Sequence, residues 1–164
     1  MSRVQRIART VRMSATAILL ATLISFTGLA QELILTDSIT PDSINANAGQ
    51  AAQEAADAWL GLIDSTNYEA SWQQAAPMFQ QQVSEAQWVQ TLRSVHGPLG
   101  AFQSRAPQER EYRTAIPGAP EGAYVIVTYG SNYTQLASAV ETVTLTKTDT
   151  GEWKVVGYYI RPAQ

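Results

Sequence analysis

The hydrophobic pattern of this sequence changes its period once, near Leu99. Before this point, apolar residues recur every three or four positions, as in amphipathic helices. After it, apolar and polar residues alternate, as in strands that bury one face. We therefore expect an α+β domain, in which N-terminal helices pack on one face of a curved, antiparallel, four-stranded sheet.

The longest predicted helix begins near Asn47 or Gly49 and ends around Ser65. Its apolar residues return at the three-and-four spacing that gathers them on one broad face, wide enough to cover a sheet. This face consists of Ala52, Ala55, Ala56, Trp59, Leu60, Leu62 and Ile63.

Two shorter helices follow. The first spans residues 68–76. The second opens at Ser84 and Gln87, which form a capping box because each side chain can satisfy the other residue's free amide. It ends at Gly97 and Pro98, a glycine that suits a left-handed cap and a proline that cannot continue the helix. Its predicted apolar face contains Trp88, Leu92 and Val95.

The alternating half predicts four strands joined by short turns. Pro107 indicates that the first strand is broken or lies at a sheet edge, because proline cannot donate to a strand ladder. Asp149-Thr-Gly151 predicts a hairpin whose glycine takes the left-handed position. The strands are expected at residues 99–105 continuing through 109–115, then 123–133, 139–147 and 153–161.

The last hairpin also predicts a register. If Thr148 pairs with Glu152, Leu145 faces Val155, Val143 faces Gly157, and Glu141 faces Tyr159. This alternation puts Glu141 and Tyr159 on the inner face, and puts Tyr158 on the outer one.

A carboxylate on the inner face is costly unless it finds donors. The alternation along residues 123–133 makes Tyr129 a neighbour of Glu141. Arg105 or Arg113 on the first strand could neutralise the carboxylate. The sharpest candidate site is therefore Glu141 with Tyr129 and Tyr159, since a carboxylate beside phenols can perform acid–base chemistry. The alternative is a structural network that satisfies the buried carboxylate.

The first 30 residues predict a secretory signal peptide cleaved near Ala30, and therefore a periplasmic or secreted protein. An uncleaved membrane anchor is the alternative. Residues 31–49 are expected to be a flexible tether, and residues 50–164 a single α+β domain. All 14 acidic residues but only seven of the 11 basic ones follow residue 30. This acidic balance argues against nucleic-acid binding.

The chain has no cysteine and one histidine. Disulfides, thiol nucleophiles and sites with several histidines are therefore excluded, and no acidic cluster with calcium-loop spacing occurs. We expect no metal and no cofactor. His96, in the last turn of its helix, is expected to cap that helix or to lie at the surface.

Six motifs of this sequence occur in a fixed order: Ala58-Trp-Leu60, Pro98-Leu-Gly100, Ser104-Arg105, Tyr124-Val-Ile-Val127, Glu141-Thr-Val-Thr144 and Gly151-Glu-Trp-Lys-Val-Val-Gly-Tyr-Tyr-Ile160. Together they resemble the motifs of an exported bacterial family known as domain of unknown function 4019. The resemblance covers residues 51–160 and implies a signal peptide, one small domain and no established activity. The order of helices and sheet is also similar to the cone-shaped nuclear-transport-factor-2-like fold. The family pattern implies a basic residue, usually arginine, where this chain has His96.

Three functions remain open. The first is a non-enzymatic exported domain that binds a small apolar ligand or a peptide in the cell envelope. The second is an enzyme of the cone fold, with Glu141 as base and Tyr129 or Tyr159 as oxyanion donor. The third is a structural or assembly protein that presents the outer sheet face to a partner, with a homodimer through the sheet as one form of this assembly. The expected pocket contains Trp59, Arg105, Tyr129, Glu141 and Tyr159; the expected outer patch contains Tyr124, Ile126, Val156 and Tyr158.

Overall fold

The computed structural model describes residues 41–164 and shows helices followed by strands. The helices are α1 (Pro41–Asp64), α2 (Tyr68–Gln74), α3 (Pro77–Gln82) and α4 (Glu85–His96), followed by the 3₁₀ turn η1 (Gly97–Leu99). The strands are β1 (Phe102–Arg113), β2 (Tyr124–Tyr133), β3 (Ala139–Lys147) and β4 (Trp153–Pro162). The predicted change of period near Leu99 is confirmed.

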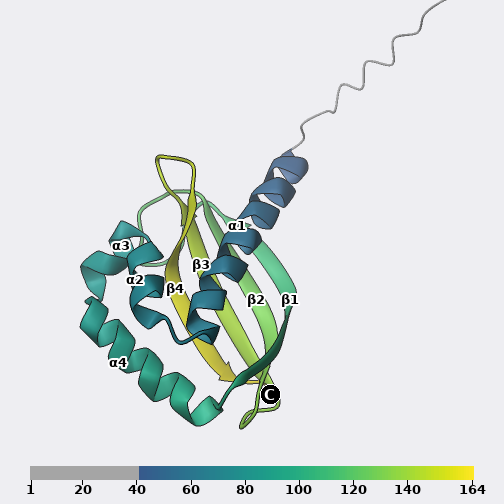
Figure 1. Ribbon diagram of the computed structural model, residues 1–164. Helices are drawn as coiled ribbons and strands as arrows, with labels where there is room; N and C mark the ends of the chain where they lie inside the picture. Colours follow the sequence, from purple (N-terminus) through teal and green to yellow (C-terminus); the bar gives the residue numbers. More distant parts are fainter. Residues whose placement is uncertain (1–40) are drawn as a thin grey trace, which may run out of the picture. The chain divides into compact units, whose positions relative to one another are not determined.

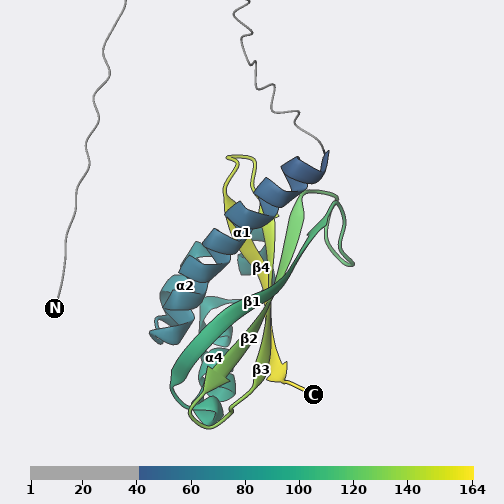
Figure 2. The ribbon, with the colours of Figure 1, turned by 90° about the vertical axis from the view of Figure 1, so that its right-hand side faces the viewer.

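The four strands form one antiparallel sheet in the order β1-β2-β3-β4 (Figure 1). Each strand pairs with the next one along the chain. The helices lie on one side of this sheet (Figure 2). The predicted α+β class is therefore confirmed. None of the helices within residues 41–164 has the length and apolar character that crossing a membrane requires.

Helix α1 begins earlier than predicted. Residues 41–49, expected in the tether, are helical, and the predicted start near Asn47 or Gly49 is wrong. Pro41 suits a first helical turn, where its missing N–H has no partner to lose, and Asp42 complements the positive end of the helix dipole. The predicted signal peptide and residues 31–40 of the predicted tether lie outside the described residues.

The end of α1 is formed by a residue in an unusual conformation. Thr66 has a φ of 60°, in the left-handed region that disfavours a β-branched residue. Its N–H donates to Ile63 O at 2.9 Å, and the Asn67 N–H donates to Leu62 O at 2.8 Å. This is the Schellman pattern, which closes a helix at a left-handed position usually taken by glycine.

The core lies between α1 and the inner face of the sheet. Helix α1 contacts all four strands, and Ala52 and Ala56 allow a close approach because their side chains are small. The large apolar residues that α1 and the sheet contribute to this core are buried. They are Trp59, Leu60 and Ile63 from α1, and Val125, Val127, Val143, Leu145 and Val155 from the sheet.

Ser71 of α2 joins three helices through buried hydrogen bonds. The indole N–H of Trp59 donates to Ser71 O at 2.7 Å, and that of Trp88 donates to Ser71 Oγ at 2.9 Å. Ser71 Oγ in turn donates to Tyr68 O at 2.7 Å. Because Trp59 belongs to α1 and Trp88 to α4, these bonds fix both helices against α2.

Helix α4 begins at the predicted capping box of Ser84 and Gln87. Its apolar face differs in part from the prediction. Trp88 and Leu92 are buried, but Val95 is 37% exposed. His96, expected at the surface or as a cap, is buried instead, and Val89 joins the inner face.

Strand β1 is a single edge strand, as Pro107 allowed. Pro107 pairs with Tyr129 of β2, and an irregularity follows before Glu109. At the other edge, the predicted hairpin is confirmed, since Gly151 has a φ of 85° and its N–H bonds to Thr148 O. The glycine there adopts a backbone conformation that other residues rarely take.

The predicted register holds only for the first part of β4. Leu145 pairs with Val155, but Thr144 pairs with Gly157, so one extra residue bulges out between them. A one-residue slip exchanges the faces of every later side chain. Tyr158 therefore faces inward, whereas Tyr159, predicted inside, is 62% exposed.

The predicted apolar patch on the outer face is smaller than expected. Tyr124 is 2% exposed, because the connection between β1 and β2 covers it and Pro120 O accepts from its hydroxyl at 2.7 Å. Tyr158 lies on the other face. Only Ile126 and Val156 remain of the expected patch, and both are half-buried.

We predict that Thr66→Gly raises the free energy of unfolding by about 1 kcal/mol, because glycine takes the left-handed conformation without a steric penalty. Thr66→Ala is the control, since it removes the side chain but keeps a Cβ. Urea unfolding of the two variants checks this. Equal effects of both substitutions would show that the backbone conformation at this position carries no strain.

Candidate functional site

Glu141 of β3 is fully buried and accepts four hydrogen bonds. Its Oε1 accepts from the hydroxyls of Tyr133 and Tyr158, the latter at 3.0 Å. Its Oε2 accepts from Arg105 Nε and from Ser131 Oγ, the latter at 2.9 Å. Both carboxylate oxygens therefore have two donors each, which is the condition for burying a charge.

Arg105 connects this carboxylate to helix α1. Its two terminal nitrogens donate to the two oxygens of Asp64 at 2.7 and 3.0 Å, a bidentate geometry. The guanidinium carbon lies 4.5 Å from the centre of the Phe102 ring. Arg105 therefore bridges the last residue of α1, its own strand β1 and the inner face of β3.

The ion pair shifts the pKa of both partners. Desolvation alone would raise the pKa of Glu141, but the hydrogen bond and charge of Arg105, with the bonds from Tyr133 and Ser131, outweigh it and lower that pKa. Desolvation alone would lower the pKa of Arg105, but hydrogen bonds to Asp64 and Glu141 raise it. Both groups are charged at neutral pH.

The remaining predicted site residues are not all gathered around Glu141. Tyr129 lies directly opposite Glu141 across the ladder, but its hydroxyl donates to Asp57 of α1 at 2.8 Å. The Trp59 indole donates to α2, and Tyr159 points out to the surface. The structure therefore brings together Glu141, Arg105 and the ring of Tyr129, whose centre lies 5.9 Å from the guanidinium carbon, and leaves Trp59 and Tyr159 in different surroundings.

Sequence reasoning missed several members of the network. Ser131 and Tyr133 follow Tyr129 at intervals of two, so simple alternation along β2 could have placed them on the same face. Tyr158 was hidden by the bulge in β4. Asp64 lies at the helix end and carries no signal for an ion pair with a strand residue 41 positions later.

His96 packs among aromatic rings at the end of α4. Its Nε2 lies 3.1 Å from the hydroxyl of Tyr158, and its ring packs beside those of Tyr68, Tyr133 and Tyr158. Desolvation lowers the pKa of His96 below 6.5; the charges of Glu141 and Asp64 oppose this shift and that of Arg105 adds to it. The imidazole is therefore neutral at physiological pH.

A cavity of about 660 Å³ lies beside this network, where α4 passes into β1. We call it the end cavity. The lower end of the domain in Figure 1 contains this junction. Aromatic and apolar side chains share the lining with polar groups, among them Asp64, Thr66, Tyr68, His96, Phe102 and Tyr133.

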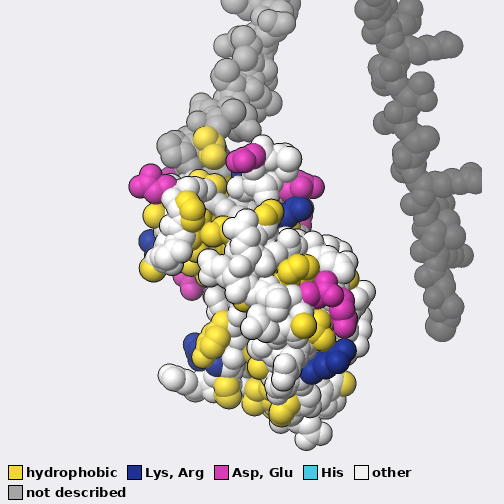
Figure 3. Space-filling model, turned by 90° about the vertical axis from the view of Figure 1, so that its left-hand side faces the viewer, with side chains coloured by type: hydrophobic (Ala, Val, Ile, Leu, Met, Phe, Trp, Pro, Cys, Tyr) yellow, Lys and Arg dark blue, Asp and Glu magenta, His cyan; other side chains and the backbone are white. Residues whose placement is uncertain are grey.

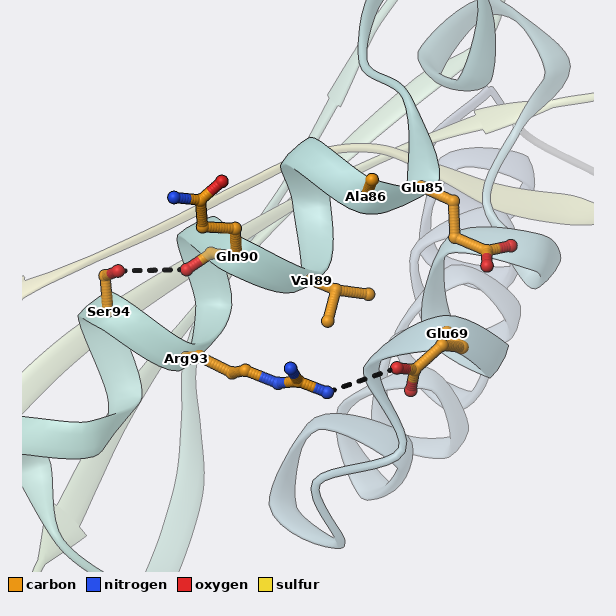
Figure 4. A pocket seen from close by; sticks show the side chains of 7 residues that line it. All are labelled: Glu69, Glu85, Ala86, Val89, Gln90, Arg93 and Ser94. Atoms are coloured by element: carbon orange, nitrogen blue, oxygen red, sulfur yellow. Dashed lines mark hydrogen bonds and ion pairs between the residues drawn. The ribbon is translucent and has the colours of Figure 1, made fainter.

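A second hollow, of about 520 Å³, lies between α2 and α4 (Figure 4). Arg93 and Glu69 meet across it at 3.4 Å, with side chains 69% and 47% exposed. An ion pair so open to water contributes little. On the side of the domain that carries α3 and α4, apolar side chains occur in small groups separated by backbone and by side chains of other types (Figure 3). Neither the hollow nor these apolar groups have the buried polar side chains expected of a ligand site.

The geometry bears on the chemistry open to Glu141. A general base needs a free lone pair near the substrate and a pKa close to the working pH. Glu141 has neither, since four donors surround it and its pKa is lowered. The Glu141–Arg105 pair also fills the space in which the expected pocket would lie. Within residues 41–164, no group of three or more metal-ligating side chains is found.

These observations define a class of small domain. In it, helices cover one face of a four-stranded antiparallel meander, and an Arg–Glu pair is buried between them. Comparison with protein families identifies the family to which the chain belongs. The family model "Protein of unknown function (DUF4019)" matches residues 55–158, and the chain belongs to this family. No curated protein matches the chain.

We predict that Glu141→Gln lowers the free energy of unfolding by about 3–5 kcal/mol, because it removes one partner of a buried ion pair. The amide nitrogen also meets donors where the carboxylate oxygen accepted. Glu109→Gln, the same change at an exposed site on β1, should cost less than about 0.5 kcal/mol. Urea unfolding measures both. A loss below about 1 kcal/mol for Glu141→Gln would contradict a stabilising role for the pair.

We also predict an acid transition that depends on Glu141. Its folded pKa lies below the ordinary value of 4.5, so the unfolded chain binds more protons as the pH falls below that value. The stabilisation by Glu141 is therefore complete above about pH 4.5 and lost as the pH falls through the folded pKa. The free energy of unfolding, measured from about pH 7 to about pH 3, should fall less steeply in Glu141→Gln than in the wild type.

Proposed function

We propose that this protein is an exported, non-enzymatic binding domain of the cell envelope, and that it holds a small, largely apolar molecule in the end cavity. The observation that carries the proposal is the cavity itself. Its volume of about 660 Å³ falls in the range of ligand sites, and rings and a few polar groups share its lining. Support for export comes from the N-terminal sequence pattern alone.

The site differs from the pocket expected around Glu141, because that space is filled. Glu141 and Arg105 take a supporting role, since they hold the end of α1 and the strands that form the cavity. The size of the cavity favours a small molecule over a peptide, most of whose length would remain outside. A binding role also needs no proton transfer from Glu141, whose lone pairs are occupied.

Native mass spectrometry of protein purified from its own host's envelope tests the proposal. We expect a mass above that of the chain, which disappears on denaturation. Gly97 lines the cavity, and a Cβ built on it meets nothing within 4 Å, so Gly97→Phe should obstruct the cavity and abolish the extra mass.

Gly61→Phe is the matched control. Gly61 is exposed on α1, and a Cβ there also meets nothing within 4 Å, but the residue does not line the cavity. This variant should retain the extra mass. A bare wild-type chain, or an extra mass that persists in Gly97→Phe, would contradict binding in the end cavity.

A further inference from the structure

The hydrogen bonds of Tyr158 fix which nitrogen of His96 carries hydrogen. A carboxylate oxygen can only accept, so the single hydrogen of the Tyr158 hydroxyl points to Glu141, 3.0 Å away. The contact of 3.1 Å between the same hydroxyl and His96 Nε2 then requires Nε2 to donate. In the neutral imidazole, Nδ1 is left with a lone pair.

This lone pair is not shielded by the protein. Nδ1 has no hydrogen-bond partner among residues 41–164, and every fully shielded side-chain nitrogen or oxygen in that part of the chain has one. Nδ1 is therefore accessible, although His96 as a whole is only 8% exposed and lines the end cavity. A buried acceptor in this position is complementary to a ligand group that carries an N–H or O–H.

The charges around the cavity favour a cation. Asp64 and Glu141 are negative and Arg105 between them is positive, which leaves one uncompensated negative charge beneath the floor. At the rim, the charges of Arg93 and Glu69 compensate each other. The tyrosines that line the cavity, Tyr68 and Tyr133, have a raised pKa because of desolvation and are neutral.

The walls suit the same kind of ligand. Tyr68, Phe102 and Tyr133 contribute aromatic rings, and ring faces attract cations as well as apolar groups. Phe102 already holds the Arg105 guanidinium at 4.5 Å. Asp64, whose side chain is 17% exposed, retains free lone pairs beyond the two that Arg105 uses.

We propose that the end cavity binds a small organic cation, a primary amine with an apolar body. Its ammonium group donates to His96 Nδ1 and lies beside Asp64, and its apolar body packs on the three rings. This inference rests on the proposed function and adds the chemical class of the ligand.

Three probes with the same phenyl body but different charge test the inference. They are 2-phenylethylammonium, 2-phenylethanol and 3-phenylpropanoate, titrated by calorimetry at about pH 7.5 into protein that was unfolded and refolded to remove any bound molecule. We expect the cation to bind at least about fivefold more tightly than the alcohol, and the anion to bind most weakly.

His96→Gln separates the hydrogen bond from the rest of the site. The glutamine amide nitrogen can still donate to Tyr158, but the amide oxygen does not occupy the position of Nδ1, so the affinity for the cation should fall about tenfold. Ser94→Gln, on the exposed side of the same helix, should leave it unchanged. Acidification should also weaken cation binding as His96 becomes charged, since its Nδ1 then donates and repels the ligand.

The outcomes distinguish the inference from the proposed function. If the alcohol or the anion binds as tightly as the cation, and Gly97→Phe abolishes that binding, the ligand class is wrong but the cavity still binds. If His96→Gln binds the cation as the wild type does, the assigned donor–acceptor pair is wrong. If no probe binds at about 1 mM, the inference is overturned, and the extra mass in native spectra decides the proposed function separately.

Discussion

Arg105 lies between two carboxylates that come from opposite layers of the domain, Asp64 at the end of α1 and Glu141 in β3. Removing such charges from water costs several kcal/mol for each ion, and only complete pairing offsets this cost. Glu141 has a full set of donors, because Ser131 and two tyrosines add their hydroxyls to the guanidinium of Arg105. These bonds can all form only when α1 lies in one position over the sheet. Apolar packing alone would tolerate small shifts of the helix.

The same network gives the neighbouring cavity its polarity. Tyr158 donates to Glu141 and accepts from His96, so the charge of a buried carboxylate determines the tautomer of an imidazole that the carboxylate does not touch. A carboxylate whose lone pairs are all occupied cannot act as a base, but it fixes the side chains that donate to it. The group open to ligands is therefore His96, which is connected to the buried charge of Glu141 through Tyr158.

Local patterns were sufficient for the class of fold. The change of period near Leu99, the Ser84 cap and the glycine of the last hairpin each depend on residues close in sequence, and each was confirmed. The expected neutralisation of Glu141 by Arg105 or Arg113 left two partners open, and the structure shows that Arg105 is the one. What could not be predicted depends on tertiary structure: an extra residue in β4 moved Tyr158 inward, and aromatic packing buried His96 at a helix end where exposure is usual.

The separation of Arg105 from its partners also bears on folding kinetics. Asp64 is 41 residues away in sequence and Glu141 is 36, whereas successive strands of the meander close short hairpins. Long loops cost entropy before their contacts stabilise the chain, so we expect the ion network to form late, after the sheet. Interactions absent from the transition state act on the unfolding rate. We therefore expect a substitution of Arg105 to act mainly on the unfolding rate and to have little effect on the folding rate.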